Sequence, residues 1–241
     1  MKKNLIILIF TGTSLLAQAQ GETRIGIKAG LTSANLFGPD IHQLASGGSP
    51  SSLSGFHAGV FVNSKLTKNF WLKSELLYNH KNTSLPIHDK WGQQYSSEFK
   101  SHYIDLYPFS PTLHIKGFQV LAGPYVSMLL NASFLRKDSL GNSTTAIFGN
   151  SIQNSNYRQK LDAGFVLGAE YELKWGICIG VRYTHGFVPV IEDAAAVSPV
   201  NTPEKPQQKI YNKSLSISVG YVFGKKKKAE VKTDPLLFKH Q

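Results

Sequence analysis

The chain has 241 residues, a formal net charge of +11 and a single cysteine. One cysteine excludes an intramolecular disulfide, so the fold has to be held by an apolar core or by a membrane. Much of the positive charge lies at the two ends of the chain, and no basic stripe interleaved with aromatic residues lies between them. This distribution argues against a nucleic-acid partner.

The first residues, "MKKNLIILIFTGTSLLAQAQ", have the pattern of a secretory signal peptide. Lys2 and Lys3 precede an apolar stretch that is too short to cross a bilayer, and Ala17 and Ala19 supply the small residues of a cleavage site. The sequence therefore predicts a signal peptide over residues 1–19, cleaved near Ala19, and a mature protein outside the cytoplasm.

After the signal peptide, apolar residues recur at every second position in eight segments, and helical periodicity is nearly absent. A period of two predicts β-strands. The predicted strands cover residues 24–34, 55–63, 69–81, 101–109, 117–129, 160–173, 175–187 and 214–223. Each has roughly the ten residues that a tilted strand needs to cross a bilayer.

The connections between these strands alternate between long and short. The long ones are the first, third, fifth and seventh, at residues 35–54, 82–100, 130–159 and 188–213, and they are rich in Ser, Asn, Gly and Pro. Alternation of this kind places all the long loops at one end of an up-and-down meander, as in transmembrane barrels with short periplasmic turns and long external loops. We therefore predict an all-β, eight-stranded antiparallel up-and-down transmembrane barrel over residues 20–223.

Period two alone leaves open which face of the sheet points outward. A soluble, lipocalin-like barrel would bury the apolar face around a ligand, whereas a membrane barrel turns it toward lipid. The opposite face here carries many glycines and serines, which suit the interior of a narrow eight-stranded barrel. The membrane barrel is therefore the leading prediction, and a soluble periplasmic or secreted barrel that carries an apolar ligand is the alternative.

Isolated charged residues share the face with the glycines. In a nearly dry barrel interior such charges need partners, because an unpaired buried charge is costly. The predicted lumen polar cluster consists of Lys28, Lys73, Glu75, Asp105, Asp162, Glu170 and Arg182. We expect a structural set of salt bridges that plugs the interior, and a proton or ion path is the alternative.

Two prolines fit the predicted strands poorly, because proline removes a hydrogen-bond donor from the ladder. Pro108 lies in the fourth predicted strand and Pro124 in the fifth. We expect Pro108 to end its strand near the periplasmic rim. Pro124 is expected to mark either a β-bulge or a misplaced strand boundary.

Several stretches together resemble a known family. They are "GIKAGLTSANL", "LKSELLYNHK", "YIDLYP", "VLAGPYVSMLL", "DAGFVLGAEYEL", "VRYTHGF" and "SVGYVF", in this order along the chain. They resemble the PorT-like outer-membrane β-barrel family of Bacteroidota, with OmpX-like architecture. The resemblance implies an eight-stranded barrel in the outer membrane of a Gram-negative bacterium, mostly without an assigned activity. Two features depart from the family pattern, namely the proline one place late in Asp105–Pro108 and the residues that follow Phe223.

The sequence contains no recognisable catalytic or metal-binding motif. Its eight histidines show no HxH or HExxH spacing, Cys178 is alone, and neither a GxSxG elbow nor a phosphate-binding loop is present. We therefore expect no enzyme activity, no metal and no cofactor. An outer-membrane lipid-modifying enzyme is the third hypothesis, because His80 and His185 are both predicted near the external rim with serines close by.

A basic tail follows the last predicted strand. Lys225, Lys226, Lys227 and Lys228 come directly after Gly224, and we expect residues 224–241 to form a disordered periplasmic tail. The lysines are interpreted either as a solvated stop that keeps the strand from sliding into lipid or as a tether to anionic headgroups or an acidic partner. The expected function is binding, adhesion or envelope assembly, with outer-membrane lipid and an envelope or secretion-machinery protein as partners.

Overall fold

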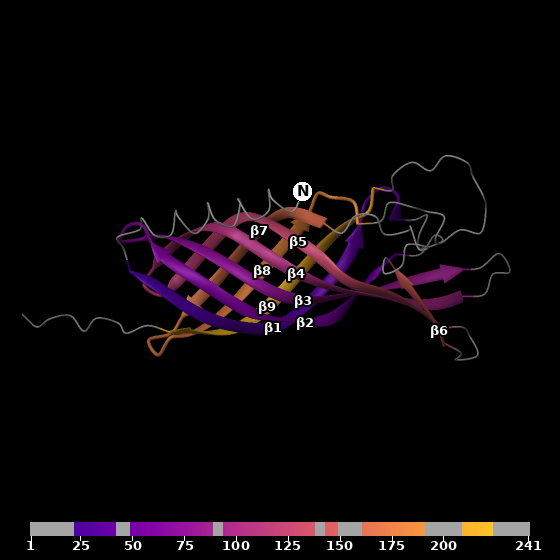
Figure 1. Ribbon diagram of the computed structural model, residues 1–241, viewed down its shortest axis with the longest axis horizontal. Coiled ribbons are helices and arrows are strands. Elements are labelled where there is room, and N and C mark those ends of the chain that lie inside the picture. The colour runs from indigo at the N-terminus through magenta and orange to yellow at the C-terminus, as the bar shows by residue number, and fades with distance from the viewer. Residues whose placement is uncertain are drawn as a thin grey trace, which may run out of the picture.

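The computed structural model describes residues 22–41, 49–88, 94–137, 143–148, 161–190 and 209–223, which form nine strands (Figure 1). In chain order these are β1 (Thr23–Phe37), β2 (Ser51–Lys65), β3 (Phe70–His88), β4 (Gln94–Ile115), β5 (Phe118–Lys137), β6 (Ser143–Phe148), β7 (Leu161–Glu172), β8 (Ile177–Gly186) and β9 (Tyr211–Phe223). No helix in these ranges is long and apolar enough to cross a membrane.

Eight of the strands close into one antiparallel barrel. The order β4-β3-β2-β1-β9-β8-β7-β5 is completed by pairing of β4 with β5, and β1 joins β9 from Ile25↔Phe223 to Phe37↔Tyr211. The predicted eight-stranded, all-β, up-and-down barrel is therefore confirmed. The extra strand, β6, was not predicted, and it pairs with the far end of β5 outside the closed ring.

The two ends of the barrel differ strongly. The short connections 66–69, 116–117 and 173–176 lie at one end, where the first and last strands also begin and end. At the other end β3, β4 and β5 continue past the remaining strands, as Figure 1 shows on the right. In an outer-membrane barrel the end with short turns is periplasmic and the other end is external.

The long connection predicted over residues 82–100 is much shorter in the structure, where β3 ends at His88 and β4 begins at Gln94. The ladder between β3 and β4 continues without a break from Glu75↔Tyr107 to His88↔Gln94, so most of this segment is a hairpin. The stretches "NTSLPIH" and "QYSSEFK" are mostly polar and carry no sustained apolar face, because a strand outside the membrane needs no lipid-facing side. The backbone ladder therefore continues beyond the point where apolar alternation in the sequence ends.

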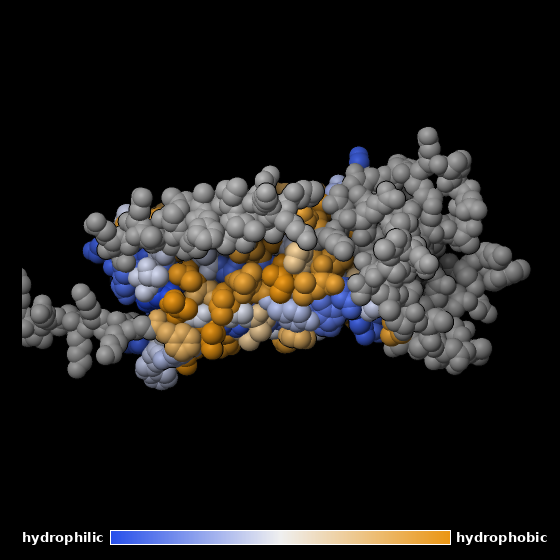
Figure 2. All heavy atoms as spheres, in the orientation of Figure 1, coloured by the Kyte–Doolittle hydropathy of each residue, from blue (hydrophilic) through white to orange (hydrophobic). Residues whose placement is uncertain are grey.

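The outward face of the barrel is apolar and the inward face is polar. Leu31 is 67% exposed and Ile217 is 61% exposed, and the two are paired neighbours on the outer wall. Figure 2 shows apolar residues gathered over the strands on this face. The lipocalin-like alternative needs the reverse arrangement, so the structure contradicts it. Exposed Phe70 and Phe118 lie at the periplasmic ends of their strands and exposed Trp175 lies in the turn between β7 and β8, as expected for an interfacial girdle.

Small residues leave room for large ones inside the barrel. A Cβ atom on Gly26 would lie 2.2 Å from Cζ of Phe61, whose ring fills the space above the glycine. A Cβ atom on Gly180 would lie 2.5 Å from Cγ of Glu170. The glycines on the inner face therefore make space for bulky and charged side chains from neighbouring strands.

The two prolines lie at one irregularity between β4 and β5. The paired register jumps from Leu106↔Val126 to Thr112↔Leu121, so Pro108 and Pro124 both fall in the interrupted part of this ladder. The irregularity lies opposite Pro124, but its extra residue is on β4, because six positions of β4 match five of β5; the bulge expected at Pro124 is therefore on the partner strand. The expectation that Pro108 ends its strand was wrong, because β4 runs on to Ile115 and the Ser74 hydroxyl donates a hydrogen bond to the Pro108 carbonyl at 2.7 Å.

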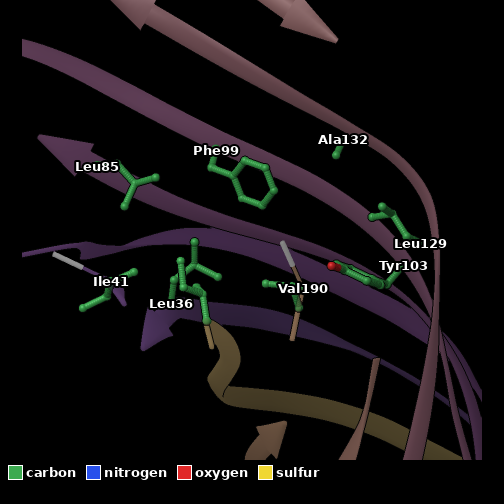
Figure 3. Close-up of a cluster of buried hydrophobic side chains, with 9 residues drawn as sticks. Leu36, Ile41, Leu85, Phe99, Tyr103, Leu129, Ala132 and Val190 are labelled. Carbon is green, nitrogen blue, oxygen red and sulfur yellow. The ribbon is translucent and has the colours of Figure 1, made fainter. Parts of the chain in front are cut away.

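An apolar cluster closes the external end of the barrel. Figure 3 shows its side chains converging from the extended strands and from two connections. The members are Leu36, Ile41, Leu85, Phe99, Tyr103, Leu129, Ala132, Val190 and Ile210, all buried. We call this set the external cap. It places a small hydrophobic core above the polar interior.

Candidate functional site

Five of the seven predicted lumen residues meet in one cluster in the barrel interior. Lys28 comes from β1, Lys73 and Glu75 from β3, Glu170 from β7 and Arg182 from β8, and each is no more than 7% exposed. All occupy inward positions of the strand alternation. We call this set the inner charge cluster.

The inner charge cluster is tightly paired. Arg182 contacts Glu75 through both terminal nitrogens, with Nη1 2.6 Å from Oε2 and Nη2 2.7 Å from Oε1. Lys28 Nζ lies 3.1 Å from Glu75 Oε1 and 2.5 Å from Glu170 Oε1. Lys73 forms an ion pair with Glu170 as well. Lys73 Nζ also lies 3.9 Å from Glu75 Oε1, and Arg182 Nη2 lies 3.4 Å from Glu170 Oε1. Each carboxylate therefore contacts three cations, which offsets the cost of burying the charges.

Aromatic rings lie beside the cations of this cluster. Lys28 Nζ is 5.3 Å and Lys73 Nζ is 4.9 Å from the centre of the Phe61 ring, and Arg182 Cζ is 4.6 Å from that of Tyr107. Attraction to the ring faces adds to the ion pairing in a desolvated interior. Phe61 and Tyr107 are themselves fully buried, so rings and ion pairs together fill this level of the barrel.

The other two predicted residues, Asp105 and Asp162, lie in a second polar group nearer the external end. Asp105 accepts hydrogen bonds from Asn79 Nδ2 at 2.8 Å and from Lys81 Nζ at 3.4 Å. Asp162 accepts hydrogen bonds from Asn212 Nδ2 at 3.1 Å and from the Tyr125 hydroxyl at 3.3 Å. A buried apolar layer of Leu77, Tyr107, Leu121, Tyr125 and Val166 accompanies the charges.

This geometry is that of a filled interior rather than an open channel. Eight strands enclose a space that side chains just fill. Here the space is occupied by the buried ion pairs, by the apolar layer and, at the external end, by the external cap. Within the described residues, no group of three or more His, Cys, Asp or Glu side chains is placed to hold a metal ion.

Comparison with known proteins assigns the family. A family model described as "Outer membrane protein beta-barrel domain" matches residues 17–192. The chain belongs to this family. It is therefore an outer-membrane β-barrel protein. No curated protein matches the chain in sequence.

Several solved structures are similar to this chain. Ail of Yersinia pestis, in complex with the heparin analogue sucrose octasulfate, is 10% identical with a TM-score of 0.42, and the match covers 84% of this chain and 99% of Ail. OprG of Pseudomonas aeruginosa is 12% identical with a TM-score of 0.38, over 86% of this chain and 99% of that one. Neisserial surface protein A is 11% identical with a TM-score of 0.38, over 83% and 97%.

Sequence reasoning missed three charged residues of this outer-membrane barrel. Lys81 pairs with Asp105, and Arg24 Nη1 lies 2.6 Å from Glu172 Oε1 near the periplasmic mouth. All three continue the inward alternation of their strands, so the signal was present in the sequence. With Lys81 included, four cations face four carboxylates in the two polar groups, whereas the predicted seven contained one carboxylate too many.

The rim histidines of the barrel contact aromatic side chains. His80 stacks on His102 with ring centres 4.3 Å apart, and the Tyr78 hydroxyl lies 2.5 Å from Nδ1 of His102. His185 lies 3.0 Å, through its Nδ1, from the Tyr183 hydroxyl. In the part of the chain that the structure describes, neither His80 nor His185 is hydrogen-bonded to a serine.

Two predicted segments of this barrel protein lie outside the described residues. They are the signal peptide, residues 1–19, and the basic tail, residues 224–241 with Lys225–Lys228. Their roles remain predictions from the sequence.

Proposed function

We propose that this outer-membrane barrel has no catalytic role and binds an envelope or external protein through its projecting external sheet. This sheet is the part of β3, β4 and β5 beyond the barrel ring, together with β6. We also propose that the chain is related to the PorT-like barrels of Bacteroidota, because of the sequence stretches quoted above. An adhesion, envelope-assembly or secretion-related partner fits this proposal.

One observation carries the proposal, namely that the interior is filled while the external end is enlarged. Buried ion pairs and apolar side chains occupy the interior, which speaks against bulk transport. The ladder of β3 with β4 continues to His88↔Gln94, and that of β4 with β5 to Ser96↔Lys137. A barrel that only anchored itself in lipid would have no use for this extension, because tilted strands of about ten residues suffice to cross the membrane.

The projecting sheet is held as a platform. Leu85, Phe99 and Ala132 come from β3, β4 and β5 and are buried in the external cap. β6 adds a fourth strand by pairing with Ala132–Lys137. Strands that are paired in a sheet and packed on a core present a preformed surface, which lowers the entropic cost of binding a partner.

Cross-linking in cells tests the platform. In a shortened variant, a two-residue Asn-Gly turn replaces residues 85–97, so that Ser84 and Glu98, which are paired, remain joined in register. A second variant lacks residues 225–241 and tests the tail. We expect the shortened hairpin to lose the cross-linked partner and the tail deletion to keep it. Loss of the partner only with the tail deletion would assign binding to the tail, and an unchanged partner in both variants would overturn the proposal.

Conductance in a planar lipid bilayer tests the filled interior. We expect the purified barrel to form no steady pore, because ion pairs and the external cap occupy the lumen. A steady nanosiemens-scale conductance would instead favour the ion-path alternative.

A further inference from the structure

A cavity of about 430 Å³ opens at the periplasmic rim of the barrel. It lies between the turn from β4 to β5 and the turn from β7 to β8, and its lining includes Arg24, Lys116, Tyr171, Glu172, Lys174 and Trp175. Its volume falls in the range of small-molecule sites. The cavity is separate from the inner charge cluster and from the projecting sheet.

The two turns that form the walls have a defined backbone. Lys116 has a φ of 49° and is followed by Gly117 with a φ of 93°, so the chain reverses tightly and projects Lys116 at the tip. The amide of Glu172 donates a hydrogen bond to the Gly117 carbonyl at 2.8 Å, which ties one turn to the neighbouring strand. Lys116 in one turn and Lys174 in the other both line the same cavity.

The charges around the cavity favour an anion. Arg24, Lys116 and Lys174 supply three positive charges, and Glu172 supplies one negative charge. Arg24 Nη1 lies 2.6 Å from Glu172 Oε1, so the carboxylate is matched within the wall. His114 also lines the cavity. The net positive lining is suited to a phosphate group.

The aromatic side chains place the cavity at the edge of the membrane. Trp175 is 79% exposed and Tyr171 is 48% exposed, and the lipid-facing Ile115 and Phe118 lie on the adjoining strands. Exposed tryptophan and tyrosine beside an apolar band mark the headgroup level of a bilayer. A cationic cavity at this depth meets the phosphates of the inner leaflet, whereas a site for a soluble anion needs no aromatic wall.

We propose that this rim cavity binds the phosphate of a glycerophospholipid from the inner leaflet. Lys116 and Lys174 contact the phosphate, while Trp175 and Tyr171 lie along the glycerol and the upper acyl chains. One bound lipid then joins two periplasmic turns that are separate in sequence.

Native mass spectrometry of the full barrel in detergent tests the site with three probes. They are phosphatidylglycerol, a galactosyl diacylglycerol with the same acyl chains, and inorganic phosphate. The test variant is Lys116→Gln with Lys174→Gln. The control is Lys65→Gln with Lys68→Gln, which removes the same charge from the end of β2 and the turn that follows it, outside the cavity. Heat-modifiable migration on a gel verifies that each variant is folded.

We expect the wild type to retain phosphatidylglycerol in preference to the galactolipid, and the test variant to bind it about tenfold more weakly. The control is expected to bind like the wild type. Equal weakening in the control, or equal binding of the galactolipid, would overturn the proposal. Inorganic phosphate that displaces phosphatidylglycerol at comparable concentration would assign the cavity to a soluble phosphate and overturn the lipid assignment.

Discussion

Arg182 on β8 and Glu75 on β3 form a two-point ion pair across the barrel interior, with nitrogen–oxygen distances of 2.6 and 2.7 Å. The two strands are not neighbours in the sheet, so this contact spans the lumen and joins opposite walls. It is shared with Lys28, which contacts Glu75 at 3.1 Å. The interior charges therefore connect opposite walls of the barrel directly. Backbone hydrogen bonds connect these walls only through the strands that lie between them.

Replacement of Glu75 by glutamine is expected to destabilise the barrel strongly. It leaves Lys28, Lys73 and Arg182 with Glu170 as their only carboxylate in the inner charge cluster. An uncompensated buried charge costs about 3–5 kcal/mol. Urea unfolding in lipid vesicles measures the change. Glu98→Gln is the control, because Glu98 pairs with Lys100 at a partly exposed site on the external hairpin and such pairs contribute at most about 1 kcal/mol. Similar losses in both variants would contradict this prediction.

The inner charge cluster is expected to tolerate loss of a cation better than loss of a carboxylate. It contains three cations and two carboxylates, so Lys73→Met balances it while Glu170→Gln worsens the imbalance. We expect Lys73→Met to retain at least about 2 kcal/mol more stability than Glu170→Gln, and the double variant to be more stable than Glu170→Gln alone. The same unfolding assay provides the double-mutant cycle. Additive losses in the double variant would show that the charges do not compensate one another.

Loss of packing in the external cap is expected to make the external segments open more often, while the barrel itself stays folded. Phe99 is buried in the cap beside Leu36 and Leu85, and Phe→Ala in a core costs about 3–5 kcal/mol. Local opening can absorb this loss. Phe99→Ala should therefore speed proteolysis of the external segments on intact vesicles while heat-modifiable migration stays unchanged. Phe109→Ala, on the lipid-facing surface, is the control and should leave the digestion pattern as in the wild type.

The apolar outer wall gives a direct test of membrane insertion. Ile217 lies in the middle of β9, and its paired neighbours Leu31 and Val181 are also exposed and apolar. A lysine near the bilayer midplane on a barrel surface costs about 2–4 kcal/mol. We expect Ile217→Lys to lose this much stability in vesicles and Ile217→Leu to behave like the wild type. Equal stability of the two variants would mean that this wall does not face lipid.

The sequence was sufficient to predict the barrel because lipid and a narrow interior impose opposite demands on alternate residues. Each predicted strand has a counterpart in the closed ring, and all seven predicted lumen residues are buried in the interior. Lys81 was overlooked because it lies at the end of its predicted strand, although it continues the spacing of Lys73, Glu75 and Asn79.

Other features left no local signal. Lys28 and Glu170 are 142 positions apart, and their contact depends on the register of strands around the whole barrel. The outer parts of β3 and β4 and the strand β6 lie beyond the lipid-facing band, so nothing selects apolar residues at alternate positions there. The rim cavity is formed by two turns whose proximity follows from the pairing of β5 with β7, strands that are more than 20 residues apart in the sequence.

The interrupted ladder between β4 and β5 has a consequence for the membrane-embedded wall. Hydrocarbon offers no partner to a backbone N–H group, so a gap in the ladder is expensive wherever donors remain. Pro108, Pro111 and Pro124 all lie in this gap and carry no N–H group. The interrupted ladder therefore contains fewer unpaired backbone N–H groups than it would with other residues at these positions. Proline weakens most sheets, but here it lowers the cost of an irregular ladder in contact with lipid.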